Sequence, residues 1–144
     1  MADTAEVFYV YPPDMLDGSW DDHSGNRRVV VQMLNLSDGT GESLVKKVDL
    51  DNLKTSNGNV PGKTVVEKIE YHTSGMGVRI YWDRAPEKLI AYLPPDASDE
   101  FDWTDVGGKV DPCDDDRTGD ILFTTAGADA GDTYDVTMHV RLKD

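Results

Sequence analysis

Residues 134–143 alternate between apolar and polar side chains without an exception, and this pattern constrains the fold more than any other feature. Successive side chains of a β-strand point to opposite faces of a sheet, so a period of two predicts a strand with one buried and one solvated face. The apolar positions, expected to face a core, are Tyr134, Val136, Met138, Val140 and Leu142.

A second strand is expected immediately before this one, over residues 119–125. The link between the two, residues 126–132, is small, polar and rich in glycine, which is typical of a turn. The two patterns together predict that the chain ends in a β-hairpin belonging to a sheet that is packed on one side.

Similar patterns recur along the chain and predict about eight strands, separated by turn signals such as Asp38-Gly39 and Ser74-Gly75. The expected strands are residues 7–11, 28–36, 44–50, 64–73, 77–82, 88–93, 119–125 and 133–142. Within residues 88–93, Leu89, Ala91 and Leu93 alternate with Ile90 and Tyr92. No segment keeps a helical period over about 11 residues. The fold class is therefore all-β, a single antiparallel β-sandwich or jelly-roll-like domain, with a small barrel as the alternative.

The 144 residues fit one domain, which we expect to span residues 27–144 after an extended N-terminal arm or loop of residues 1–26. Residues 7–11 are apolar and aromatic, and Pro12-Pro13 ends the run. Two roles fit such a segment: a first strand of the domain, or an arm that lies on a neighbouring chain by strand addition.

Residues 94–118 form the second stretch without a sandwich pattern, and a loop of this length in a small domain is usually functional or packed at an interface. Aromatic side chains stand in both irregular stretches, so we expect them to bind a partner. The expected partner-binding residues are Val7, Phe8, Tyr9, Tyr11, Trp20, Phe101 and Trp103.

The net charge of −14 argues against nucleic acid as a partner, because a polyanion repels it. Thirteen acidic residues fall between Asp96 and Asp135, opposed there by Lys109 and Arg117 alone. Such a surface serves solubility, or it meets a basic partner or divalent cations. No apolar run approaches the roughly 18 residues of a membrane span, and the N-terminus lacks a signal-peptide pattern, so we expect synthesis in a cytoplasm and no membrane partner.

No catalytic motif is visible, and we expect neither an enzyme nor a cofactor. Cys113 has no base at a triad-like spacing, and His23, His72 and His139 lack the paired spacing of zinc ligands. The densest carboxylate cluster could suit calcium, but its spacing is not that of a helix–loop–helix site, so a solvated acidic turn is favoured. That cluster consists of Asp111, Asp114, Asp115 and Asp116.

Several motifs between Leu34 and Leu142 are similar to those of a family of small tailed-phage virion proteins. The motifs are Asn35-Leu36-Ser37-Asp38-Gly39-Thr40-Gly41-Glu42-Ser43, Val45-Lys46-Lys47-Val48-Asp49-Leu50, Ile69-Glu70-Tyr71, Gly75-Met76-Gly77-Val78-Arg79-Ile80-Tyr81-Trp82-Asp83, Gly107-Gly108, Thr118-Gly119-Asp120-Ile121-Leu122-Phe123-Thr124-Thr125 and Ala130-Gly131-Asp132-Thr133-Tyr134. The resemblance carries no catalytic residues.

This resemblance implies a virion component, and a capsid decoration (cement) protein is the leading expectation. Such a protein would sit on the capsid exterior, with the major capsid protein and neighbouring copies of itself as partners, in a homo-oligomer for which a trimer is one option. A neck, tail or fibre component of the virion is one alternative. A carbohydrate- or calcium-binding module, suggested by Trp20, Trp82, Trp103 and the acidic turn, is the other.

Overall fold

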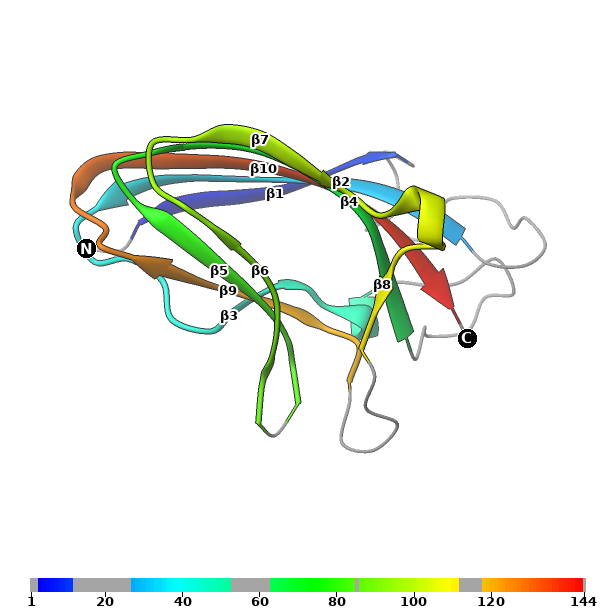
Figure 1. Ribbon diagram of the computed structural model, residues 1–144. Coiled ribbons are helices and arrows are strands. Elements are labelled where there is room, and N and C mark those ends of the chain that lie inside the picture. The colour runs from blue at the N-terminus through cyan, green and yellow to red at the C-terminus, as the bar shows by residue number, and fades with distance from the viewer. Residues whose placement is uncertain (1–2, 12–26, 53–62, 85, 112–117, 144) are drawn as a thin grey trace.

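The computed structural model describes residues 3–11, 27–52, 63–84, 86–111 and 118–143, and it consists of two facing antiparallel sheets (Figure 1). The larger sheet has the order β1 (Thr4–Tyr11), β2 (Arg27–Asp38), β10 (Ala130–Lys143), β4 (Lys63–Ser74) and β7 (Ser98–Asp102), with β8 (Lys109–Val110) also pairing with β4. The smaller sheet has the order β3 (Val45–Val48), β9 (Ile121–Ala126), β5 (Gly77–Trp82) and β6 (Lys88–Leu93). Two short 3-10 turns, η1 (Leu50–Asn52) and η2 (Thr104–Val106), complete the described elements. The all-β, sandwich-like class is confirmed, whereas jelly-roll connectivity stays a prediction.

The core lies between the sheets and is built from the side chains of each strand that point inward. All five apolar positions of β10 expected to be buried are at most 2% exposed. From the smaller sheet, Ile80, Trp82 and Phe123 are equally inaccessible. The alternation of apolar and polar residues in the sequence of β10 thus matches the alternation of buried and accessible side chains in the structure. Within the described residues no helix is long and apolar enough to cross a bilayer.

The predicted C-terminal hairpin is wrong, because β9 and β10 belong to different sheets. β9 pairs with β3 and β5, while β10 pairs with β2 and β4. The glycine-rich link around Gly127 therefore crosses from one sheet to the other. The alternation in β10 requires only that one face of the strand is buried against a second sheet. It does not say which strands pair with β10, so the local pattern could not distinguish a hairpin with β9 from a crossing between sheets.

The alternation expected for β6 also fails in its first half, because a β-bulge interrupts the ladder. Ile80 pairs with Ala91 and Tyr81 pairs with Leu89, so Ile90 has no opposite residue on β5. The extra residue reverses the phase: Ile90 is 2% exposed and Leu89 is 44% exposed.

Residues 94–118 contain two strands that the sequence did not predict. β7 has the sequence Ser-Asp-Glu-Phe-Asp, and its residues pair with β4 from Lys68↔Asp102 to His72↔Ser98. Three acids in five positions give no strand signal, so only the ladder to β4 makes this segment a strand. The backbone N–H of Trp103 continues the contact by donating to the Glu67 carbonyl at 2.9 Å.

The N-terminal segment pairs within its own chain. β1 is antiparallel to β2 from Thr4↔Leu36 to Tyr11↔Val30, with a register shift between Tyr9 and Tyr11. Of the two roles weighed for this segment, the structure therefore has the edge strand of the domain. The remainder of the expected arm, residues 12–26 with Trp20, lies outside the described residues.

Two adjacent glycines offer a test of the β7–β8 connection. Gly107 and Gly108 both have positive φ, 83° and 94°, but a Cβ on Gly107 would meet nothing within 4 Å. A Cβ on Gly108 would lie 2.4 Å from Val65 Cγ1 and 3.2 Å from the Val66 carbonyl oxygen. We expect Gly107→Ala to lower the free energy of unfolding by about 1–2 kcal/mol through backbone strain. Gly108→Ala should cost at least about 1 kcal/mol more through overpacking.

Urea denaturation of both variants measures this difference. Equal losses for the two variants would show that Gly108 does not sit against Val65.

Candidate functional site

The aromatic and apolar residues predicted on β1 divide between two faces. Val7 and Tyr9 pair with Met33 and Val31 and pack into the core, where Tyr9 is 9% exposed. Phe8 and Tyr11 are 45% and 57% exposed. Only the second pair is available to another molecule.

Phe101 and Trp103 lie at the opposite edge of the larger sheet, in a stack with Tyr71. The ring centroids of Tyr71 and Phe101 are 5.8 Å apart, and those of Phe101 and Trp103 are 5.6 Å apart. Lys109 Nζ lies 5.1 Å from the Trp103 ring centroid and donates to the Ile90 carbonyl at 2.5 Å. This stack packs against the core and closes the β6–β7 side of the sandwich. Burial, with a smaller contribution from Lys88, lowers the pKa of Lys109 from its ordinary value.

A shallow groove of about 300 Å³ lies on the outer face of the larger sheet, across β1, β2, β10 and β4. We call it the outer groove. Its lining residues are Thr4, Glu6, Leu34, Asn35, Leu36, His72, Thr133, Tyr134 and Asp135. Leu34 and Leu36 alternate with the buried Asn35 and Ser37, so they point outward, and Leu36 is 52% exposed. The groove therefore has an apolar floor on a face where solvated side chains are expected.

The rim of the outer groove is polar and carries two acids, Glu6 and Asp135. Gln32 Nε2 donates to Asp135 Oδ1 at 3.0 Å, and His72 Nδ1 makes a hydrogen bond with Ser98 Oγ. An apolar floor beside carboxylates suits contact with a protein surface that presents apolar and basic side chains.

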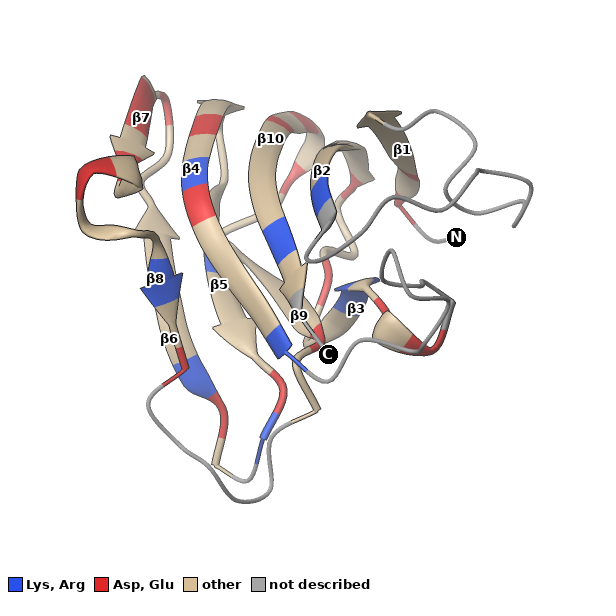
Figure 2. Cartoon of the chain, turned by 90° about the vertical axis from the view of Figure 1, so that its right-hand side faces the viewer, with Lys and Arg blue, Asp and Glu red and all other residues tan. Residues whose placement is uncertain are grey.

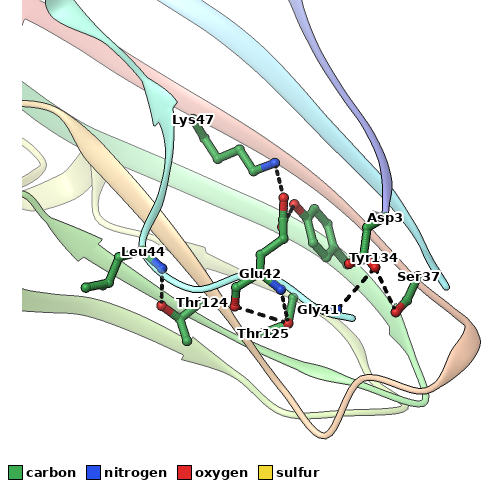
Figure 3. A network of polar contacts seen from close by, with 9 residues as sticks. All are labelled: Asp3, Ser37, Gly41, Glu42, Leu44, Lys47, Thr124, Thr125 and Tyr134. Carbon is green, nitrogen blue, oxygen red and sulfur yellow. Dashed lines mark hydrogen bonds and ion pairs between the residues drawn. The ribbon is translucent and has the colours of Figure 1, made fainter. Parts of the chain in front are cut away.

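A buried polar network joins the groove-lining Tyr134 to the β2–β3 connection (Figure 3). The Glu42 carboxylate accepts from Lys47 Nζ at 2.5 Å and from the Tyr134 hydroxyl at 2.6 Å. The side chains of Lys47 and Glu42 are only 4% and 7% exposed. The Glu42 backbone N–H donates to Thr125 Oγ1 at 2.8 Å, which fixes the connection to β9.

Asp3 holds the other end of this connection. Its Oδ1 atom accepts from Ser37 Oγ at 3.2 Å and from the Gly41 N–H at 3.2 Å (Figure 3). The same atom also accepts from the Asp38 N–H at 3.1 Å. The start of β1 is thus tied to the end of β2, beside the outer groove. We interpret the network as a structural support, because Glu42 is already bound by a cation and a phenol.

The remaining candidate residues belong to the scaffold wherever the structure describes them. Trp82 is 1% exposed, and its Nε1 donates to Thr64 Oγ1 at 3.2 Å, so it presents no ring to a sugar. Asp111 Oδ1 pairs with Arg84 Nε at 3.2 Å, while Asp114, Asp115 and Asp116 lie outside the described residues. In the part of the chain that the structure covers, no group of three or more His, Cys, Asp or Glu side chains is arranged to hold a metal ion.

Leu36 and Val10 are exposed, at 52% and 54%, and Leu34 on the same face of β2 as Leu36 is partly exposed; the sequence pattern did not mark these residues as contact residues. The sequence did contain a signal for Leu34 and Leu36. Residues 29–36 are apolar at nearly every position, with Gln32 and Asn35 as the exceptions, so a strand here must place apolar side chains on both faces of the sheet, including the outer one. Comparisons with known proteins add no further assignment, since no family model, no curated protein and no solved structure matches this chain.

The buried ion pair gives a stability prediction. Lys47→Met keeps the side-chain volume but leaves the Glu42 carboxylate buried without its cation, so we expect a loss of about 3 kcal/mol in the free energy of unfolding. The matched control is Lys68→Met, which removes a more exposed pair with Glu100, where the side chains are 28% and 50% exposed. The control should lose less than about 1 kcal/mol.

Urea denaturation of the two variants gives the comparison. A Lys47→Met protein as stable as the control would contradict the proposed support role of the network.

The buried phenols predict a loss of stability at alkaline pH. Burial raises the pKa of Tyr134, with the Glu42 carboxylate adding to the effect, and burial also raises the pKa of Tyr9, with Asp49 adding. A group whose pKa is raised in the folded state contributes stability that is complete below its unfolded pKa, about 10 for tyrosine, and declines as the pH rises above it.

The free energy of unfolding should therefore fall as the pH rises above about 10, and the fall should be less steep in Tyr134→Phe because one such phenol is gone. Urea denaturation as a function of pH tests this. An unchanged slope in Tyr134→Phe would refute the contribution of Tyr134.

Proposed function

We propose that this chain is a non-enzymatic structural protein of a tailed-phage virion, a decoration (cement) protein that binds the outer face of the major capsid protein lattice. The observation that carries the proposal is the outer groove, where Leu34 and Leu36 form an apolar floor on the outer face of the larger sheet. A structural protein that attaches to a lattice needs such a rigid, shape-defined contact surface rather than a catalytic cleft.

The motifs that resemble phage virion proteins support the proposal through their positions. Residues 35–43 contain Asn35 and Leu36 of the groove and Glu42 of the network, while residues 118–125 supply Thr125 and Asp120. Asp120 accepts from the Leu50 N–H at 2.7 Å and pairs with Lys46 at 3.1 Å. The family-like residues thus include Asn35 and Leu36, which line the groove, and others that hold the connections between strands behind it.

The charge distribution also supports an exterior position. Acids gather on β7 and η2 at one edge of the larger sheet, away from β1 (Figure 2). A net charge of −14 repels packaged DNA, so it suits a protein on the outside of a filled shell better than one inside it. Attachment through the groove would leave the acidic β7 edge facing solvent or a basic partner.

Copy number in purified particles tests the proposal against its alternative. Quantitative mass spectrometry should find this protein on the order of hundreds of copies per particle, in proportion to the capsid lattice. A stoichiometry of about a dozen, or recovery with isolated tails, would favour the neck, tail or fibre role and exclude the decoration role.

A substitution in the groove tests the surface itself. Leu36→Lys places a charge on the apolar floor and should weaken binding to undecorated capsids at least about tenfold, equivalent to about 1.4 kcal/mol. Val106→Lys, at a position 78% exposed on η2, is the control and should bind as the wild type does. Equal binding by both variants in a co-sedimentation assay would exclude the groove as the attachment surface.

A further inference from the structure

The outer edge of β1, with which no described strand pairs, differs from the other edges of the two sheets. An exposed edge strand presents unpaired N–H and C=O groups to other chains, and proteins usually protect such edges with charges, bulges or short strands. β7 carries three acids in five residues, β3 is four residues long with two lysines, and β6 is bulged at Ile90 and begins with Lys88. Each of these edges is therefore protected against pairing.

β1 has less of this protection, because its register shift lies near its end, between Tyr9 and Tyr11, and leaves Thr4 to Tyr9 regular. It is eight residues long, Glu6 is its one charged residue, and no described strand covers its outer edge. Phe8, Val10 and Tyr11 leave apolar surface exposed along it, at 45%, 54% and 57%. A long apolar edge of this kind is suited to pairing with another strand.

We infer that β1 pairs antiparallel with β1 of a second copy of this chain, so that a two-fold axis joins the larger sheets of two subunits into one continuous sheet. A two-fold interface brings the same patch of both subunits together and must be self-complementary. The inference goes beyond the virion proposal and does not depend on it.

The strand register makes β1 self-complementary. A two-fold axis normal to the sheet places residues of the same face opposite each other, and we assign Phe8 to the axis, where it lies opposite its own counterpart. With Phe8 at the centre, the two phenyl rings form a cross-strand aromatic pair, and Glu6 lies opposite Val10 of the partner subunit. This register keeps the two Glu6 carboxylates apart.

Electrostatics selects this edge for self-association despite the large negative charge of each copy. The acidic β7 edge is four strands away from β1, roughly 19 Å at the usual strand spacing and beyond a Debye length of about 8 Å in physiological salt (Figure 2). The antiparallel arrangement also brings the Glu6 end of one subunit toward the Tyr11 end of the other, so the one charge of each β1 strand faces an uncharged end. β1 therefore brings little charge into contact with a second β1.

Sedimentation equilibrium of the purified full chain tests the inference. The wild type should show a concentration-dependent monomer–dimer equilibrium. Phe8→Lys places two ammonium groups together at the centre of the interface and should raise the dimer dissociation constant at least about tenfold. Leu89→Lys is the matched control, because Leu89 is 44% exposed on β6, the edge strand of the smaller sheet, and it should leave the dimer unchanged.

Amide hydrogen exchange on the wild type provides a second measurement that does not require a variant to fold. Exchange within β1 should slow as protein concentration rises through the dimer transition, while exchange within β6 should not change. A wild type that stays monomeric, a trimer, equal effects of Phe8→Lys and Leu89→Lys, or β1 exchange independent of concentration would each overturn the inference. Because these measurements use the purified chain alone, they leave the copy number in a particle as a separate question.

Discussion

The pairing of β10 with two neighbours is the interaction on which the rest of the structure depends. Its ladder runs along β2 from Ala130↔Asp38 to Leu142↔Arg27 and along β4 from Thr133↔Ser74 to Lys143↔Lys63. Because its apolar residues all face inward, this central strand also supplies the middle of the core. Tyr134 on the same strand donates to Glu42 of the Glu42–Lys47 pair, so the β2–β3 connection is tied to the central strand of the larger sheet.

The outer groove and the β1 edge are consequences of this arrangement. The Glu42–Lys47 ion pair and the hydrogen bonds that Asp3 accepts fix the β2–β3 connection, which directly follows the strand carrying the outward leucines. At the opposite side of the sheet, Phe101 and Trp103 serve the interior by closing the gap between β6 and β7. The exposed apolar surface of the larger sheet is therefore concentrated at β1 and β2, where both proposed contacts lie.

The candidate site was only partly foreseeable. The aromatic character of β1 drew attention to Phe8 and Tyr11, which are exposed, but also to Val7 and Tyr9, which the strand phase turns into the core. Neighbouring residues of a strand point to opposite faces, so a shift of one residue turns a contact residue into a core residue. Which residues of β1 point inward was fixed only by the pairing of β1 with β2. The exposure of Leu36 could not be predicted, because it follows only once the buried face of β2 is known.

The sequence by itself determined the all-β class, eight of the strands and the buried face of β10, because a period of two in side-chain polarity is a local property of an extended chain. The tertiary structure alone decided which strands pair. It separated β9 from β10, made the acidic segment Ser98–Asp102 a strand through its ladder to β4, and shifted the phase of β6 with a bulge at Ile90. Pairing depends on contacts between residues far apart in the chain, and short glycine-rich links permit both a hairpin and a crossing between sheets, so no local pattern could distinguish them.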